Sequence, residues 1–120
     1  MRPDPRLRKR SEFQLVYNRG MRVPGRFVVL FGLAHTGGAC RLGITVSRKV
    51  GTAVVRNRAR RRIRELFRRQ PATSLFAGDV VVNARRACAG VRWSELEQDF
   101  TQCLARLVTK AARDASQSGC

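Results

Sequence analysis

Arginine dominates one short stretch of the chain, "GTAVVRNRARRRIREL", residues 51–66. A guanidinium group donates paired hydrogen bonds to phosphate oxygens and stacks on bases, so arginine is well suited to bind a polyanion. Acidic residues that could neutralise the run are scarce, because Glu65 is the single acid between Arg41 and Arg69. Like charges one helical turn apart repel each other. We therefore expect an anionic partner at this segment, with a solvated charged face as the alternative.

The apolar residues of this region recur with the period of an α-helix, from Ala53 to about Arg69. Because a disordered basic tail has no need of an apolar stripe, the pattern predicts a helix that packs on a core. The stripe consists of Val55, Ala59, Ile63, Leu66 and Phe67. At about 100° per residue, one broad polar face collects Arg56, Asn57, Arg60, Arg61, Arg64 and Arg68. Arg58, Arg62 and Arg69 are predicted to point away from that face.

The charge of the whole chain favours nucleic acid over a membrane as the partner. Its 120 residues include 25 Lys and Arg against 8 Asp and Glu, a formal net charge of +17. The hydrophobic fraction of 43% excludes a mostly disordered polycation. No apolar stretch approaches the roughly 18 residues of a membrane-spanning helix.

Residues typical of catalysis or metal binding form no pattern. The four cysteines, Cys40, Cys88, Cys103 and Cys120, are widely spaced, which argues against a metal site or a disulfide framework and suits a reducing cytosol. His35 falls in a predicted turn with no partner to orient it as a base. We expect no catalytic residue and no metal ligand in the polypeptide.

Local patterns predict the remaining elements. A Ser11–Gln14 capping box opens a short helix, which Gly20 ends in a left-handed cap. Residues 26–34 and 40–47 predict an antiparallel hairpin. Further strands are predicted at 21–24 and 79–85. The first helix would place Phe13, Val16 and Tyr17 on one face, and the second hairpin strand would point Leu42, Ile44 and Val46 inward and Arg41, Gly43 and Thr45 outward.

A long amphipathic helix follows, with a second capping box at Ser94 and Glu97. Its apolar face comprises Leu96, Phe100, Cys103, Leu104, Leu107 and Ala111. The order of elements predicts an α/β sandwich, with helices packed on a small mixed sheet. We expect one domain over residues 1–120, with an ordered core of about residues 6–113 and mobile ends.

Four blocks of the sequence, in order, resemble the protein subunit of bacterial ribonuclease P. The central block, "RLGITVSRKVGTAVVRNRARRRIREL" (41–66), contains the family's R-N-R motif at Arg56, Asn57 and Arg58. The others are "RLRKRSEFQLVYNRG" (6–20), "GRFVVLFGL" (25–33) and "GDVVVNAR" (78–85). Arg62 departs from the apolar residue that the family often has there, so it would either snorkel or add an RNA contact.

The resemblance implies an αβββαβα fold with a left-handed βαβ crossover, similar to one domain of a ribosomal protein. Such a crossover runs against the usual right-handed rule, and periodicity does not predict it. In this family the RNA subunit is the ribozyme that removes the 5′ leader from precursor tRNA, and the protein is its cofactor. The polypeptide alone is therefore expected to be inactive.

The resemblance also implies where RNA binds. The family's arginine helix faces the RNA subunit, a role that falls here on Arg48, Lys49, Arg56, Asn57, Arg58, Arg60, Arg61, Arg64 and Arg68. The family's central cleft, between the first helix and the sheet, holds the single-stranded leader, and the matching residues are Phe13, Tyr17 and Phe31. From the residues alone, Phe13 and Phe31 fit an ordinary core better, whereas Tyr17 suits a wet cleft.

The expected partners are the RNA subunit and precursor tRNA, with no membrane and no obligate protein partner, and the expected location is the cytoplasm. Mg²⁺ is expected at the active site of the RNA, held mostly by phosphates and water. The alternative is a ribosomal or general RNA-binding protein of similar fold. Such a protein would keep the basic helix but have no use for an aromatic cleft.

Overall fold

The computed structural model describes residue 7 and residues 9–34, 40–70 and 78–118, with side chains up to residue 113. This part of the chain forms a four-stranded mixed sheet with three α-helices and two short 3₁₀ turns. In order, the elements are α1 (Arg10–Arg19), β1 (Met21–Pro24), β2 (Val28–Ala34), β3 (Arg41–Thr45), η1 (Arg48–Val50), α2 (Ala53–Arg69), β4 (Gly78–Ala84), η3 (Arg86–Ala89) and α3 (Trp93–Ser118). The expected αβββαβα order is confirmed.

The strands lie in the order β1-β2-β4-β3, so β4 separates β2 from β3. The predicted hairpin of residues 26–34 with 40–47 is therefore wrong, because β4 pairs antiparallel with β2 and parallel with β3. The reason lies in β4 itself, where Val80, Val81 and Val82 are all fully buried. A strand that is covered on both faces belongs in the middle of a sheet, where its backbone groups find partners on both sides.

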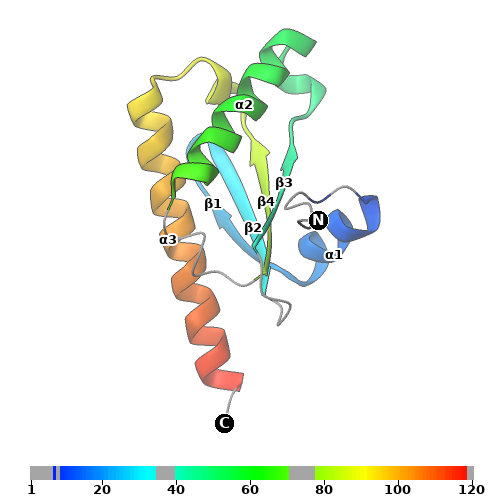
Figure 1. Cartoon of the computed structure of the whole chain (residues 1–120), viewed down its shortest axis with the longest axis vertical. Helices are drawn as coiled ribbons and strands as arrows, with labels where there is room; N and C mark the ends of the chain where they lie inside the picture. Colours follow the sequence, from blue (N-terminus) through cyan, green and yellow to red (C-terminus); the bar gives the residue numbers. More distant parts are fainter. Residues whose placement is uncertain (1–6, 8, 35–39, 71–77, 119–120) are drawn as a thin grey trace, which may run out of the picture.

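β3, α2 and β4 form a βαβ unit, because β3 and β4 are parallel. In Figure 1 both strands point upward, α2 lies in front of them, and β4 stands to the left of β3. In a right-handed βαβ unit seen from its helix side with the strands pointing upward, the second strand lies to the right of the first. The crossover is therefore left-handed, as the resemblance implied.

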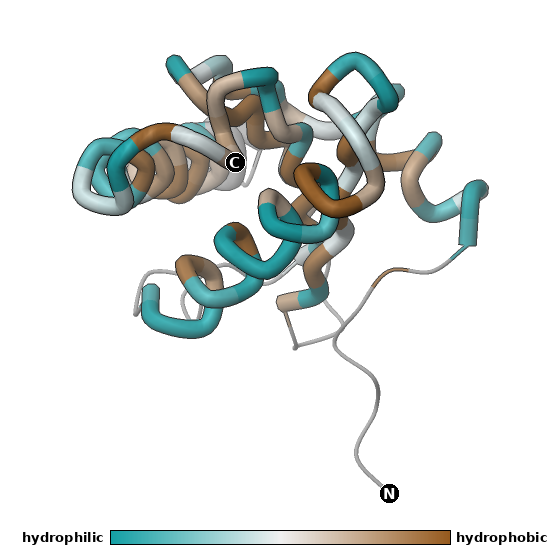
Figure 2. The backbone as a smooth tube through the Cα atoms, turned by 90° about the horizontal axis from the view of Figure 1, so that it is seen from above, coloured by the Kyte–Doolittle hydropathy of each residue, from teal (hydrophilic) through white to brown (hydrophobic). Residues whose placement is uncertain are grey.

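Helices cover both faces of the sheet. α2 and α3 pack on one face, where Ile63 and Phe100 are fully buried, and the apolar stripes predicted for both helices are confirmed. α1 covers the other face by packing Val16 against Val81. Figure 2 shows the hydrophilic residues of α2 recurring along its outer side, away from the sheet. No helix within the described residues combines the length and the hydropathy needed to cross a bilayer.

Both predicted capping boxes are wrong. α1 already begins before Ser11, and its first turn is capped by Glu12, whose Oε1 accepts a hydrogen bond from the Lys9 backbone N–H at 3.1 Å. A carboxylate there also suits the positive end of the helix dipole. α3 begins at Trp93, so Ser94 lies inside its first turn.

Gly20 ends α1 in an extended conformation, with φ −80° and ψ 168°, and the predicted left-handed cap is wrong. Its small size matters instead, because a Cβ at this position would lie 2.4 Å from the Val16 carbonyl oxygen. The glycine thus lets the chain turn tightly from α1 into β1.

The apolar side of β3 packs into the main core as predicted, with Leu42 buried. Its other side, predicted to face outward, is instead covered by α1. Gly43 is consequently buried, and Arg41 and Thr45 are half-buried. This second layer forms much of the candidate site.

Candidate nucleic-acid interface

α2 is a rigid support for the arginines that the sequence singled out. Its N-terminus is capped by Thr52, whose Oγ1 accepts a hydrogen bond from the Val55 N–H at 3.4 Å. Ala59, Ile63 and Leu66 are fully buried in the main core, so the helix cannot rotate without breaking that core. The polar side of α2 is thereby held toward solvent.

Arg48 and Lys49 lie directly before α2, in η1, and both are exposed. Gly51 connects η1 to α2 with φ +152°, a backbone conformation that an L-residue with a side chain rarely adopts. The turn at Gly51 therefore fixes the orientation of η1 relative to the start of α2. It places the two cations of η1 at the N-terminal end of the arginine helix.

The arginines of α2 differ in what they contact. Arg60 Nη1 donates to Asn57 Oδ1 at 2.9 Å, which orients both side chains on the outer face. Arg61 and Arg64 are exposed and form no hydrogen bond or ion pair with another described side chain. Arg56 is half-buried. The polar face predicted from helical phasing is thus exposed to solvent. Arg61 and Arg64 on this face are available to bind an anion.

Arg68, which phasing placed on the same face, is bound instead to Glu65. Arg68 Nη2 lies 2.7 and 2.8 Å from the two carboxylate oxygens, and Arg69 Nε donates to Glu65 Oε1 at 2.8 Å. These contacts, first of all the Arg68 hydrogen bond, lower the pKa of Glu65. The C-terminal turn of α2 is therefore partly neutralised, and the excess of positive charge lies nearer its N-terminus.

Arg62 packs inside the fold rather than pointing into solvent. Its guanidinium donates to the carbonyl oxygens of Cys88, at 2.7 Å, and Val91, and its Cζ lies 5.6 Å from the centre of the Trp93 ring. Burial lowers the pKa of Arg62, and the nearby charge of Arg58 lowers it further. Of the two sequence-based interpretations, a snorkelling side chain is the nearer one, since Arg62 fixes the η3–α3 connection to α2.

The three aromatic residues predicted for the cleft lie together between α1 and the sheet. Phe13, Tyr17 and Phe31 are half-buried around a small second core. The rings of Tyr17 and Phe31 meet edge to face, with centroids 4.8 Å apart. Tyr17 Oη donates to Asn83 Oδ1 at 2.8 Å and shares a hydrogen bond with Thr45 Oγ1 at 3.1 Å. The cluster therefore joins aromatic rings to polar groups of β3 and β4, a combination that can stack a base and bond its edge.

Gly43 supports this cluster in a way that the sequence did not reveal. A Cβ at Gly43 would lie 2.7 Å from the Phe13 ring and 3.2 Å from the Leu7 side chain. Leu7 is itself held here, since its N–H donates to the Leu42 carbonyl at 2.9 Å. Because Gly43 has no side chain, the Phe13 ring can pack directly on the backbone of β3.

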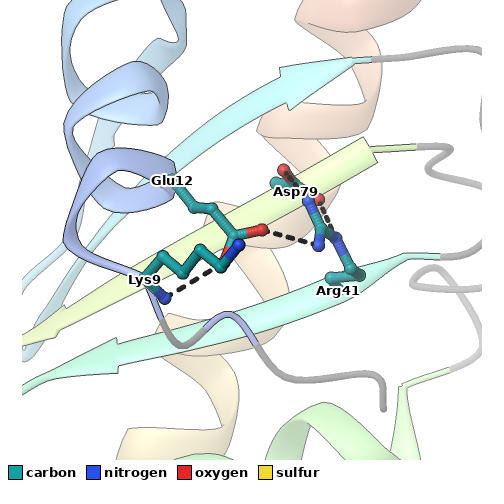
Figure 3. Close-up of polar contacts among 4 residues, drawn as sticks. All are labelled: Lys9, Glu12, Arg41 and Asp79. Atoms are coloured by element: carbon teal, nitrogen blue, oxygen red, sulfur yellow. Dashed lines mark hydrogen bonds and ion pairs between the residues drawn. The ribbon is translucent and has the colours of Figure 1, made fainter. Parts of the chain in front are cut away.

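Arg41 connects α1 to the sheet. From β3 its Nε and Nη2 donate to the two carboxylate oxygens of Asp79 on β4 at 2.8 and 2.9 Å, and Nη1 donates to Glu12 on α1 at 2.8 Å. Figure 3 shows this side chain reaching between the two carboxylates. The hydrogen bonds to Asp79, above all, raise the pKa of Arg41. A signal was present in the sequence, because a lone Asp79 in an apolar strand needs a charged partner.

The arginine face and the aromatic cluster meet at the edge of the sheet. A hollow of about 110 Å³ lies beside β3, between α1 and α2. It is lined by Leu7, Phe13, Leu42, Ile44, Arg60 and Arg64. Two groups of residues far apart in the sequence therefore form one continuous surface, aromatic at one end and cationic at the other.

The described residues include no group of three or more His, Cys, Asp and Glu side chains placed to hold a metal ion. Cys40, Cys88 and Cys103 are free thiols, and burial raises the pKa of each to about 11. His35 and Cys120 lie outside the described residues.

Comparisons with a family model and with individual proteins point to the same family. The family model described as Ribonuclease P matches residues 1–108. The ribonuclease P protein component of Acidothermus cellulolyticus is 39% identical over 116 residues, which cover 92% of this chain and 95% of that protein. The protein component of Clostridium acetobutylicum is 39% identical over 97 residues, covering 79% and 82%.

Solved structures agree in fold. The RNase P protein of Staphylococcus aureus superposes with a TM-score of 0.78 at 30% identity, covering 88% of this chain and 99% of that one. The RNase P protein of Thermotoga maritima gives a TM-score of 0.76 at 30% identity, covering 84% and 96%. Together with the match to the family model, these similarities show that the chain belongs to the bacterial ribonuclease P protein family.

Proposed function

We propose that this chain, as the protein subunit of ribonuclease P in tRNA 5′ maturation, holds the two RNAs of the reaction at once. The arginine side of α2 and the adjacent η1 bind the RNA subunit, and the aromatic cluster binds the 5′ leader of precursor tRNA. The observation that supports this arrangement is the hollow beside β3, which brings Phe13 next to Arg60 and Arg64. A leader lying over the rings would thus pass directly to the helix that holds the ribozyme.

The RNA subunit is the ligand that fits α2. Exposed arginines with no described counter-ion, such as Arg61 and Arg64, can each pair with a phosphate. Arg48, Lys49, Arg56, Asn57, Arg58 and Arg60 extend the same basic surface. Arg68 contributes least, because Glu65 already binds it. A surface of this charge would also replace part of the salt that folded RNA needs to screen its crowded phosphates.

The leader is the ligand that fits the aromatic cluster. Half-buried rings of Phe13, Tyr17 and Phe31 can stack unpaired bases for about 1–3 kcal/mol each, whatever their sequence. This tolerance suits leaders, which differ from one precursor to the next. The hydroxyl of Tyr17 is bonded to Asn83 and Thr45, which holds the Tyr17 ring in position at the floor of the cluster.

Catalysis itself is assigned to the RNA. Mg²⁺ would be bound by phosphates and water of the ribozyme, as suits a hard ion that gives up its waters reluctantly. The role of the polypeptide is then to orient the substrate and to neutralise charge. Each of these raises the fraction of precursor that is bound in a reactive position.

Substitutions in the cluster test this division of roles. Tyr17→Ala and Phe31→Ala are expected to weaken binding of precursor tRNA about tenfold while leaving mature tRNA nearly unaffected, since only the precursor has a leader to stack. Binding is measured with the reconstituted holoenzyme. Phe67→Ala, a half-buried aromatic residue of α2 in the other core, is the matched control. An equal loss for precursor and mature tRNA would contradict a leader site here.

A further inference from the structure

The opposite flank of α2 contains a second hollow, larger than the one beside β3. Its volume is about 610 Å³, within the range of roughly 300–1,000 Å³ that small-ligand sites occupy. It is lined by Val54, Arg58, Arg61, Arg62, Glu65 and Trp93. We call it the Trp93 hollow.

An apolar floor distinguishes the Trp93 hollow from an ordinary charged surface. Val54 is 76% exposed, and it lines the same hollow as the half-buried ring of Trp93. A single exposed valine needs no explanation. The tryptophan ring, in a concave site on a helix rich in arginine, offers a flat apolar surface on which a base can lie, and Val54 makes a further part of the wall apolar.

The ring is also held in place. Arg62 Cζ and Arg69 Cζ lie 5.6 and 5.8 Å from the centre of the Trp93 ring, and Arg62 is itself fixed by the carbonyls of Cys88 and Val91. A side chain fixed in this way loses little conformational entropy when a ligand binds. The platform therefore exists before any ligand arrives.

The charges at the rim favour an anion. Arg58 and Arg61 are exposed and have no hydrogen-bond or ion-pair partner among the described side chains. Glu65 is the acid that lines the hollow, and Arg68 and Arg69 already bind it. The hollow thus combines a platform for a base with two available cations for its phosphates.

We propose that the Trp93 hollow binds an unpaired nucleotide of the RNA subunit, with the base against the Trp93 ring and the flanking phosphates on Arg58 and Arg61. This inference rests on the proposed function of α2. The RNA subunit is the source, because the hollow lies on the flank of α2 away from Arg60 and Arg64, which border the aromatic cluster. α2 is then contacted by the ribozyme on its outer face and on this flank.

The chain provides its own probe, since Trp93 is its single tryptophan. We expect Trp93 fluorescence to be quenched, and shielded from acrylamide, when the full-length protein is titrated with the RNA subunit. A single-stranded leader oligonucleotide alone should leave Trp93 emission unchanged. The same titration, followed by filter binding, reports whether the RNA subunit binds at all.

Val54→Glu places a carboxylate in the hollow without disturbing the core. It should weaken binding of the RNA subunit about tenfold, near the lower part of the range for one stacked base, and should abolish the Trp93 quenching. The charge-matched control is Ala112→Glu, at an exposed position in the C-terminal part of α3. Figure 1 shows α3 running to the end of the molecule opposite the start of α2. The control variant should lose much less affinity and keep the quenching.

The possible failures are distinct. RNA-subunit binding with unchanged Trp93 emission, or equal losses for the two variants, would overturn the nucleotide site while the proposed function stands. Quenching by the leader oligonucleotide alone would overturn the assignment to the RNA subunit. Absence of any RNA-subunit binding by the wild-type protein would overturn the proposed function together with this inference.

Discussion

Replacing Arg41 by Ala removes the cation that joins β3, β4 and α1. In the wild-type protein the Arg41 guanidinium forms three charge-assisted hydrogen bonds, two with Asp79 and one with Glu12, at 2.8–2.9 Å. Without it, Asp79 loses two charge-assisted hydrogen bonds within a buried strand, and Glu12 loses a contact that draws α1 to the sheet. The substitution therefore tests what holds α1 over the aromatic cluster.

Exposure sets the size of the effect. Breaking a fully buried ion pair from one side costs about 3–5 kcal/mol, whereas exposed pairs contribute less than about 1 kcal/mol. The Asp79 side chain is 7% exposed and that of Arg41 is 35% exposed. Water can therefore replace part of the hydrogen bonding that Arg41 supplies to the carboxylates. We expect Arg41→Ala to lower the free energy of unfolding by about 2–3 kcal/mol.

Urea-induced unfolding followed by circular dichroism measures this loss, and amide hydrogen exchange shows whether α1 opens first. Arg68→Ala is the matched control, because it removes an equally short guanidinium–carboxylate pair whose arginine is 76% exposed. That variant should lose less than about 1 kcal/mol. If both variants lost the same small amount, or if exchange in α1 did not change, Arg41 could not be what secures α1.

Other predictions follow from single contacts in the site. Gly43→Ala would push a Cβ into the Phe13 ring, 2.7 Å away, so we expect a loss of about 1–3 kcal/mol in unfolding free energy and weaker leader binding. Tyr17→Phe removes the hydroxyl contacts but keeps the ring, so urea unfolding should show a loss of about 1–2 kcal/mol while leader affinity in fluorescence polarisation stays within about twofold. Burial raises the pKa of Cys88 and of Cys103 to about 11, so alkylation by iodoacetamide at pH 8 should be about 100-fold slower in the native than in the urea-unfolded protein. Because folding raises both pKa values above 9.0, the stability linked to these thiols is complete below about pH 9 and is lost as the pH rises toward 11.

The helices could be predicted from the sequence because their information is local. The stripe that includes Ala59, Ile63 and Leu66 has a helical period, and the same three residues are fully buried in α2. The run of valines at residues 80–82 likewise predicted the strand β4. The arginine face followed from helical phasing, although Arg68 is bound to Glu65 at the end of the helix.

Long-range pairing could not be predicted in the same way. The insertion of β4 between β2 and β3 depends on which strands can bury both faces, and periodicity within each strand does not contain that information. The specific partners of Arg41 and Arg62 could not be predicted for a similar reason. Their partners lie 38 residues from Arg41, at Asp79, and 26 and 29 residues from Arg62, at two backbone carbonyls.

Reconstituted cleavage of precursor tRNA tests the central claim most directly. The purified protein, the cognate RNA subunit and Mg²⁺ are combined at physiological salt, and release of the 5′ leader is followed on a gel. We expect cleavage with both subunits present, little cleavage by the RNA alone at that salt, and none by the protein alone. Release of the leader by the protein without any RNA subunit would contradict the account.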